Sequence, residues 1–525
     1  MIQLRRFESA FQIPEGTEDD SVLEALVESF DLTEGSTSSH KVVWHETFDW
    51  RLYRAGLRLT TESGPTTALV LRDAERKLLH RGPVPRRVGF TEDLSEGSLR
   101  KTLGPVLSMR TLLPLATLES KNREFQVLDR ETKTVARLAL RRSQARGTKG
   151  EWKRIPAILE LRSVVGYDRR FHEVADFLGK VLGLQTLPGD EFSRVLDVLD
   201  RTPADYSSKV KITLDPSFQA VEATRHIHRE LLQAIRVNEE GTRKDLDSEF
   251  LHDFRVAVRR TRSALSQVKN VFPAKTLDHF KREFAWLGRL TGPTRDLDVY
   301  LLKIGGYRDS LPEEVRPDLD PLRDFLVQEQ RREQRKLARA LNSKRYKRLL
   351  SDWQAFLDQN ISPVDISDEG PPAFAERPIV DLASERIWKV YRRVMKRGLA
   401  IDDDTPAEAV HEVRIDGKKL RYLMEFFRSL YPEKEMVKSI SILKRLQDNL
   451  GDFNDYEVQQ ASLHDFADRM ARDPKTKAST LLAMGRLQAR LAEGQARERQ
   501  RFGERFTAFA APEHRQRFRR LFKSA

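Results

Sequence analysis

The spacing of hydrophobic and polar positions changes near residue 215. Before it, short stretches alternate apolar and polar residues or stay apolar for a few positions, which is typical of β-strands. These stretches are 57–60, 68–72, 135–141 and 158–162. Residues 20–30 and 169–183 instead repeat apolar residues every three or four positions, which indicates helices. The pattern predicts an α+β domain rich in antiparallel strands over residues 1–215.

From about residue 218 the spacing is helical almost throughout. Helices are predicted at 218–237, 247–271, 276–291, 320–359, 382–400, 407–430 and 434–451. A stretch rich in Pro and acidic residues, 361–380, interrupts them and is predicted to be a linker. The sequence therefore predicts an all-α domain over 218–510, with halves at about 218–360 and 381–510.

The two helical halves repeat one another. Residues 251–256 align with residues 410–415 at an offset of 159 positions, and the alignment continues without a gap to Val299 and Val458. It preserves His, Arg, Gly, Pro and Asp over about fifty residues, which indicates two copies of one helical unit. We expect two antiparallel helical bundles related by a pseudo-twofold axis.

The positive charge is concentrated in the helical part. The chain has 93 Lys and Arg against 80 Asp and Glu, a net charge of +13. Residues 1–215 carry 34 basic and 32 acidic residues, which leaves 59 and 48 for the remainder, an excess of +11. A basic domain suggests a polyanionic partner, such as nucleic acid, an acidic membrane surface or a phosphate polymer. A solvated, highly charged helical surface would give the same balance.

Several classes of chemistry are excluded or unsupported. The chain has no cysteine, which excludes disulfides and thiolate sites. It has no apolar run of about 18 residues, so no transmembrane helix is expected, and no apolar stretch after residues 1–6 indicates a signal peptide. The P-loop, His-Glu-x-x-His, Gly-x-Ser-x-Gly and dinucleotide motifs are absent. We expect a cytoplasmic protein without membrane contact, cofactor or bound metal.

The repeated segment places basic side chains on one helix face. At 100° per residue, His252, Arg255, Arg259 and Arg262 share an arc of about 80° beside an apolar stripe. The second copy reproduces this arc, which gives eight candidate binding residues: His252, Arg255, Arg259, Arg262, His411, Arg414, Lys418 and Arg421. Arg260 and Lys419 point elsewhere and are secondary candidates, and no catalytic residue is predicted.

Cations this close repel one another unless anions compensate them, and few acidic residues share the arc. Two such faces would line a cleft that suits a chain of closely spaced negative charges, because Arg forks grip phosphate oxygens. The alternative is that these cations pair with acidic residues of neighbouring helices. Asp296 and Asp455 are expected to be such structural partners, or helix caps.

These paired helices resemble the CHAD domains, the conserved-histidine α-helical domains. The resemblance rests on the His-x-x-Arg-x-x-x-(Arg/Lys)-(Arg/Lys)-x-Arg pattern in both halves and on the downstream segments 295–299 and 450–455. It covers about 218–510. It implies two pseudo-twofold-related bundles that bind inorganic polyphosphate in a basic central cleft, with the eight candidates as phosphate contacts. The expected role is to target the protein to polyphosphate bodies.

Residues 1–215 resemble a diverged CYTH domain, a β-tunnel that hydrolyses triphosphate or processes triphosphorylated compounds. Segments 48–59 and 158–162 carry the resemblance. The family's opening Glu-x-Glu-x-Lys corresponds here to residues 3–7, Gln-Leu-Arg-Arg-Phe, and its later Glu-x-Glu pair is Glu160-Leu161-Arg162. Because divalent metals need clustered carboxylates, we expect a degenerate tunnel that is weak or inert. The basic residues that could line it are Arg58, Arg72, Arg137 and Arg141.

Two alternatives stay open. The first is a metal-dependent inorganic triphosphatase or polyphosphatase that uses the N-terminal tunnel, with Glu8, Glu46 or Asp49 replacing the missing ligands. The second is a nucleic-acid-binding protein, which the basic charge alone favours. Binding of single-stranded nucleic acid calls for aromatic platforms beside the basic groups. The two arcs contain none, although Tyr422 lies near the second.

Overall fold

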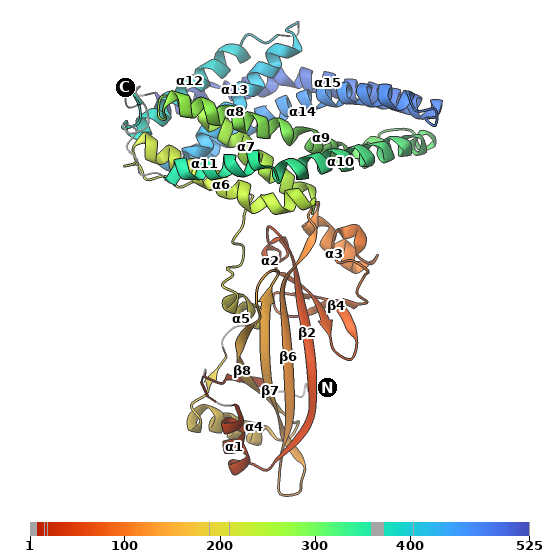
Figure 1. Ribbon diagram of the computed structural model, residues 1–525, viewed down its shortest axis with the longest axis vertical. Helices are drawn as coiled ribbons and strands as arrows, with labels where there is room; N and C mark the ends of the chain where they lie inside the picture. The colour runs from red at the N-terminus through yellow and green to blue at the C-terminus, as the bar shows by residue number, and fades with distance from the viewer. Residues whose placement is uncertain are drawn as a thin grey trace. The chain divides into compact units, whose positions relative to one another are not determined.

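The computed structural model describes residues 8–14, 16–17, 19–187, 190–208, 211–358, 372–402 and 404–523 (Figure 1). The chain divides into two compact units, Met1–Ser207 and Ser208–Ala525, called the first and second units below. The first is built on an antiparallel sheet and the second is helical, so the predicted fold class is confirmed. The predicted tunnel segment at residues 3–7 lies outside the described residues.

A nine-stranded sheet forms the first unit, in the order β5-β4-β3-β2-β6-β7-β8-β1-β9. All of its paired strands are antiparallel. Its strands are β1 (Glu8–Gln12), β2 (Leu32–Thr47), β3 (Leu57–Ser63), β4 (Thr67–Asp73), β5 (Leu78–Gly82), β6 (Leu112–Leu128), β7 (Thr134–Gly147), β8 (Lys153–Ser163) and β9 (Gln185–Thr186). The four strands predicted from alternation fall within β3, β4, β7 and β8, so those predictions are confirmed.

Short helices pack against this sheet. They are α1 (Asp19–Ser29), α2 (Arg51–Arg54), α3 (Ser98–Leu107), α4 (Asp168–Asp176) and α5 (Glu191–Val198). Helix α4 packs on β7 and β8, and its apolar side joins a core with α1 and the sheet. The predicted helix at 169–183 continues from α4 as a single π-helical stretch, Phe177–Val181. Helix α5 begins at Asp190, whose side chain accepts the backbone N–H of Ser193 at 2.7 Å.

Eleven helices of eight or more residues form the described part of the second unit. They are α6 (Ala220–Lys244), α7 (Ser248–Gln267), α8 (Ala274–Leu290), α9 (Gly292–Asp309), α10 (Asp320–Leu341), α11 (Lys344–Asp358), α12 (Ile379–Gly398), α13 (Ala407–Phe426), α14 (Glu433–Ala471), α15 (Ala478–Phe509) and α16 (Pro512–Phe522). None of the helices in the described ranges is long and apolar enough to cross a bilayer.

The helix limits differ from the sequence predictions in several places: α6 ends later, α13 ends earlier, α15 and α16 are not predicted, and three further differences have a local cause. The predicted helix at 320–359 is two helices, because the chain turns at Asn342 and the Ser343 hydroxyl accepts the N–H of Tyr346 at 3.3 Å. Helix α14 continues past residue 451 to Ala471, since Gly451 does not break it. Helix α9 was not predicted; it begins at Gly292-Pro293, where proline suits the first helical turn.

The second unit has internal symmetry. Helices α6, α7 and α8 begin 159 residues before α12, α13 and α14, respectively. The two copies also contact each other through equivalent helices, because α6 packs on α12 and α7 packs on α13. The first residues of α6 and α12 exchange equivalent hydrogen bonds: Ala220 N–H donates to the Arg377 carbonyl at 2.8 Å, and Ile379 N–H donates to the Phe218 carbonyl at 3.0 Å. Contacts between equivalent residues are the signature of a twofold axis.

Two hydrophobic cores hold this arrangement. The larger one gathers α6 to α8, α11 to α13 and α16, and it buries the apolar stripes of α7 and α13. The smaller one joins the hairpins α9–α10 and α14–α15, which lie side by side (Figure 1). The end of the predicted linker is ordered: Ala375 is buried against α6, and α12 already starts at Ile379. Helices α7 and α13 therefore have fixed positions beside the pseudo-twofold axis.

Candidate functional site

Helices α7 and α13 carry all eight predicted site residues on neighbouring elements. Helix α7 begins at Asp247, whose carboxylate accepts the backbone N–H groups of Glu249 and Phe250 at 3.0 and 3.2 Å. Its apolar stripe, represented by Phe254 and Val258, is buried. The basic arc of each helix therefore points away from the core, as its periodicity predicts.

Arg255 lies at the inner end of the basic arc, half-buried. Its Nη1 donates to the carbonyl of Gly288 at 3.3 Å and to the hydroxyl of Thr291 at 3.1 Å. The Gly288 carbonyl, near the end of α8, also accepts the Thr291 hydroxyl at 3.2 Å. Burial lowers the pKa of Arg255, Asp296 opposes that shift, and Arg259 adds to it. Arg255 thus connects α7 to α8 as well as adding positive charge to the site.

Arg414 is the counterpart of Arg255 in the second copy. Its Nη2 lies 3.8 Å from Asp455 Oδ1, and its Nε is buried without a hydrogen-bond partner among the described residues. Burial lowers the pKa of Arg414, Asp455 opposes that shift, and Arg259 of the other copy adds to it. Acidic residues of α9 and α14 therefore compensate part of the inner charge.

The two histidines are held by equivalent positions of the two copies. Arg295 Nη2 donates to His252 Nδ1 at 3.0 Å, and His411 Nδ1 lies 2.7 Å from Asn454 Oδ1. Arginine has no acceptor, so the proton of neutral His252 is on Nε2, whereas His411 Nδ1 donates to the amide oxygen. In both copies one ring nitrogen is fixed by α9 or α14, and the ring orientation is set.

A pocket of about 450 Å³ opens between α7, α8 and α13. Below it is called the α7–α8–α13 pocket. Its lining residues are Arg259, Arg262, Ser263, Ser266, Lys281, Ala285, Ile415, Lys418, Lys419 and Tyr422. Five of the ten carry a positive charge and none is acidic. The pocket therefore brings five cations together. Three are among the eight predicted site residues, one is a predicted secondary candidate, and one was not predicted.

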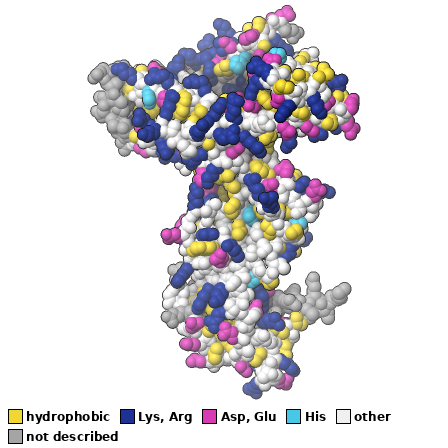
Figure 2. All heavy atoms as spheres, turned by 45° about the vertical axis from the view of Figure 1, so that its right-hand side comes forward, with side chains coloured by type: hydrophobic (Ala, Val, Ile, Leu, Met, Phe, Trp, Pro, Cys, Tyr) yellow, Lys and Arg dark blue, Asp and Glu magenta, His cyan; other side chains and the backbone are white. Residues whose placement is uncertain are grey.

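The five cations of this pocket differ in their compensation: Lys281 lies 3.5 Å from Asp278 and Lys419 lies 3.3 Å from Asp416. Within the described ranges, no ion pair or side-chain hydrogen bond joins Arg259, Arg262 or Lys418 to another residue. Burial, together with Arg414 and Arg259, lowers the pKa of Lys418 from 10.5 to about 8. Burial and Arg289 lower the pKa of Arg262. Lys and Arg side chains also gather densely on the visible surface of the second unit (Figure 2). An anion entering the pocket would relieve repulsion that the fold leaves in place.

Arg421 of the second arc and the two secondary candidates are paired with carboxylates. Arg421 Nε lies 2.7 Å from Glu425 Oε1, and its Nη1 donates to Gln447 at 3.3 Å. Arg260 of α7 lies 2.5 Å from the same carboxylate, at Oε2. Lys419 lies 3.3 Å from Asp416 while still lining the pocket. The structure therefore places Arg421 and Arg260 in an ion-pair network between α7 and α13, outside the lining of the α7–α8–α13 pocket.

Sequence reasoning missed Lys281 of α8. Its counterpart in the second copy is Ile440, so the repeat that revealed the other candidates gives no signal at this position. It also missed the two serines of α7, Ser263 and Ser266, whose role depends on how α8 and α13 pack. Tyr422 was noted as a nearby aromatic residue, and it does line the pocket.

The first unit has a different kind of basic pocket. About 580 Å³ in volume, it is lined by Arg58, Arg72 and Arg141 of the predicted tunnel residues, whereas Arg137 is exposed on β7 and does not line it. Arg72 pairs with Glu62. Arg141 lies 2.8 Å from Glu160 and 2.9 Å from Glu191. Of the six arginines that line this pocket, Arg72, Arg141 and Arg162 pair with carboxylates of the same pocket.

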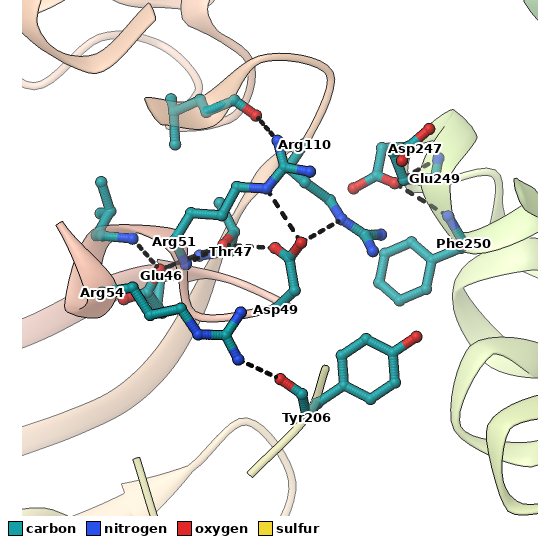
Figure 3. A network of polar contacts seen from close by, with 12 residues as sticks. Glu46, Thr47, Asp49, Arg51, Arg54, Arg110, Tyr206, Asp247, Glu249 and Phe250 are labelled. Atoms are coloured by element: carbon teal, nitrogen blue, oxygen red, sulfur yellow. Dashed lines mark hydrogen bonds and ion pairs between the residues drawn. The ribbon is translucent and has the colours of Figure 1, made fainter. Parts of the chain in front are cut away.

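The three carboxylates that could replace the missing metal ligands are also engaged, and Figure 3 shows the contacts of two of them, Glu46 and Asp49. Glu46 accepts the backbone N–H groups at the start of α2, those of Leu52 and Tyr53, at 2.9 and 2.7 Å. Asp49 lies 3.0 Å from Arg51 and 3.4 Å from Arg110. Glu8, which is largely exposed, lies 3.6 Å from Arg162. In the described part of the chain, no group of three or more His, Asp or Glu residues could hold a metal ion.

Known proteins are similar to both units. Residues 226–464 match the family model described as the CHAD domain. Two curated proteins of Mycobacterium tuberculosis, of strains CDC 1551 and H37Rv and described as uncharacterized, are 27% identical over 249 residues. The alignment covers 46% of this chain and 45% of theirs, so it spans less than half of their length.

Solved structures are similar as well. The CHAD domain from the plant Ricinus communis has 26% identity and a TM-score of 0.48, and the match covers 58% of this chain and 96% of that chain. For the first unit, a Hippeastrum protein described as a candidate adenylyl cyclase with a dominant triphosphatase activity has 11% identity and a TM-score of 0.25, over 39% of this chain and 100% of that chain. The family match over residues 226–464, a stretch that holds all eight predicted site residues, identifies the helical second unit as a CHAD domain.

Proposed function

We propose that the second unit binds inorganic polyphosphate in the α7–α8–α13 pocket. The observation that carries the proposal is the lining of that pocket, which brings five Lys and Arg residues from three helices together without an acidic residue. The polyphosphate ligand comes from the resemblance to CHAD domains, while the pocket supports a polyanion. A linear chain of phosphates fits because its charges are closely spaced and its oxygens accept several hydrogen bonds at once.

The residues of the pocket have distinct parts in this proposal. Arg259 is central among the cations. Its charge lowers the pKa of both Arg414 and Lys418, as expected for a residue that lies near each of them. Arg262 and Lys281 extend the positive surface along α7 and α8. The Ser263 hydroxyl is buried and has no partner among the described residues, so it can donate to a phosphate oxygen.

The binding energy would be largely electrostatic. Phosphate contacts release condensed counterions, so affinity should fall steeply as salt rises. Binding of this kind requires no bond cleavage. The proposed biological role of the binding is to recruit the protein to polyphosphate bodies in the cytoplasm. Binding would tolerate chains longer than the pocket, since the outer phosphates remain in solvent.

The test is calorimetric titration of the full chain with long-chain polyphosphate at two salt concentrations, with single-stranded RNA as competitor at equal phosphate concentration. Tight binding that RNA does not displace supports the proposal. Binding that RNA displaces equally well would favour a nucleic-acid-binding protein, and no binding would overturn the proposal.

The hydrolase alternative is tested in the same preparation. Triphosphate and polyphosphate are incubated with the full chain and Mg²⁺ or Mn²⁺, and released phosphate is measured. The pairing of Glu46 and Asp49 with backbone amides and arginines argues against them as metal ligands. Metal-dependent phosphate release would assign catalysis to the first unit, and its loss on Glu46→Gln would locate the reaction there.

A further inference from the structure

The two copies of the helical repeat are not equivalent around the α7–α8–α13 pocket. Arg262 lines the pocket, whereas its counterpart Arg421 is paired with Glu425 at 2.7 Å. The position of Glu425 in α13 corresponds to Ser266 in α7, and Ser266 lines the pocket. One exchange, serine for glutamate, therefore distinguishes an open basic face from a compensated one.

Two further positions add to this difference. Lys281 of α8 lines the pocket, and its counterpart in α14 is Ile440. Arg289 of α8 acts on Arg262, and its counterpart in α14, Asp448, acts on Arg421. The α7–α8 side therefore has more positive charge than the α13–α14 side at these two positions, although Asp278, whose counterpart is Val437, lies 3.5 Å from Lys281 and offsets part of its charge.

The electrostatics of the equivalent arginines reflect this difference. Burial and the neighbouring Arg289 lower the pKa of Arg262. Burial also acts to lower the pKa of Arg421, but Glu425 and Asp448 outweigh it and raise that pKa. The cationic form of Arg421 is thus already stabilised by carboxylates, while that of Arg262 is not.

Glu425 also compensates a second cation. Its Oε2 lies 2.5 Å from Arg260 Nη2 on the opposite copy, while its Oε1 accepts from Arg421. One carboxylate thus binds two guanidinium groups, as a phosphate of a polyanion would. On the α13–α14 side, the Glu425 carboxylate therefore occupies the two guanidinium groups that a phosphate of the ligand would otherwise bind.

We propose that polyphosphate continues from the α7–α8–α13 pocket along α7 and α8, on one side of the pseudo-twofold axis, and that Glu425 closes the equivalent path along α13 and α14. This inference rests on the proposed polyphosphate binding and makes Glu425 the residue that limits how many phosphates the unit holds. Arg421 is then a partner of Glu425 rather than a phosphate contact.

Reciprocal exchange of the two counterparts tests this. In the full chain, Ser266→Glu places a carboxylate beside Arg262, and we expect polyphosphate affinity to fall by about tenfold or more. Glu425→Ser frees Arg421 and Arg260, and we expect affinity to rise about threefold or more, with a steeper salt dependence because another phosphate is bound. Weaker or unchanged binding by Glu425→Ser would overturn the inference.

Glu425→Ser also removes an ion pair between helices, which could lower stability. A second comparison therefore uses variants that keep Glu425. Arg262→Ala should lower affinity about tenfold, and Arg421→Ala should lower it by no more than about twofold. Equal losses would mean that both faces hold the ligand and would overturn the one-sided path. If the unsubstituted chain does not bind polyphosphate, the proposed function fails and this inference fails with it; unequal losses in a chain that binds support both.

Discussion

The two basic pockets of this protein contain similar residues and differ in their compensation. In the first unit, Arg72 and Arg141 are paired with glutamates that line the same pocket. In the α7–α8–α13 pocket no lining residue is acidic, and within the described ranges Arg259, Arg262 and Lys418 have no ion pair, whereas Lys281 and Lys419 pair with carboxylates outside the lining, Asp278 and Asp416. Counting Lys and Arg in the linings, six against five, would therefore rank the pocket of the first unit slightly higher. The difference shows that the availability of a cation depends on its nearest carboxylate, which the sequence does not reveal.

The compensation has a physical consequence for stability as well as binding. Cations paired at half-buried positions stabilise the local structure, and removing one partner leaves the other with an unmet desolvation cost. Uncompensated cations in a pocket oppose folding and favour an external anion. The first unit should therefore respond to mutation through stability, and the second unit through ligand affinity.

The largest effect is expected from charge reversal inside the α7–α8–α13 pocket. Lys281→Glu places a carboxylate beside the remaining cations, so polyphosphate affinity should fall by about 100-fold in calorimetric titration. The matched control is Lys347→Glu, which reverses an exposed lysine of α11 outside the pocket lining. Equal losses in both variants would mean that the overall charge of the unit, rather than this pocket, holds the ligand.

The next effect separates the two pockets by stability. Arg141→Met leaves Glu160 and Glu191 without this partner, so the free energy of unfolding of the first unit should fall by about 2 kcal/mol, while polyphosphate affinity stays unchanged. Chemical denaturation followed by tryptophan fluorescence measures the first quantity. Arg142→Met, at a neighbouring exposed residue, is the control and should change stability by less than about 0.5 kcal/mol. A loss of polyphosphate binding with Arg141→Met would remove the distinction between the pockets.

The pH dependence of binding sharpens the account of Lys418. Its pKa in the free protein is about 8, lowered by burial and by Arg414 and Arg259. A bound polyanion favours the charged form and raises the pKa of Lys418, so its contribution is fully present below pH 8 and is lost as pH rises from 8 towards the higher pKa of the complex. Affinity should fall by up to about tenfold between pH 7 and pH 9. Lys418→Arg, which stays charged, should show a much flatter profile; an identical profile would exclude Lys418 as its source.

The smallest expected effect compares the two copies of the repeat away from ligand. His228 of α6 is fully buried beside Trp353, and neither of its ring nitrogens has a partner among the described residues. Its counterpart in α12 is Ile387, also buried. His228→Ile should raise the free energy of unfolding by about 1 kcal/mol, because it removes an unsatisfied polar group. The reciprocal variant Ile387→His should destabilise the unit, and a stabilising effect there would contradict the argument.

The same histidine predicts a pH effect with a definite sign. Burial lowers the pKa of His228 from 6.5 to about 3, so the unfolded chain binds a proton that the folded chain does not. This difference in proton binding leaves the free energy of unfolding unaffected above pH 6.5 and lowers it progressively as pH falls toward 3. Denaturation at pH 7 and pH 5 should show a smaller loss for His228→Ile than for the unsubstituted chain. An equal loss would assign the acid sensitivity to other groups.

Sequence reasoning was most successful where one signal appears twice. The 159-residue offset predicted equivalent helices, and α6 to α8 begin at the expected distance from α12 to α14. It also selected Arg259 and Lys418, which meet in one pocket. It could not identify Lys281, because the repeat has Ile440 at that position. Nor could it predict the pairing of Arg421, since Glu425 compensates it only when α7 and α13 pack together.

The sequence pattern also did not predict that the first copy has two helices, α8 and α9, where the second copy has one. The second copy continues through Gly451 as one helix, while the first copy breaks at Thr291. Arg255 donates to Thr291 and Gly288 at that break, so a predicted ligand contact also has a structural bond. Helical periodicity reports the face on which a side chain lies, but the partners on that face come from tertiary packing.

Arg259, Arg262 and Lys418, which have no ion pair within the described ranges, are the cations of the α7–α8–α13 pocket expected to bind polyphosphate. The most direct measurement is calorimetric titration of the full chain and two double variants with long-chain polyphosphate at fixed salt. Arg259→Ala with Lys418→Ala removes one pocket cation from each copy, and Arg331→Ala with Arg335→Ala removes the same charge from exposed positions of α10. We expect about a 100-fold loss for the first pair and about a twofold loss for the second. Equal losses, or full binding by the pocket variant, would contradict the account.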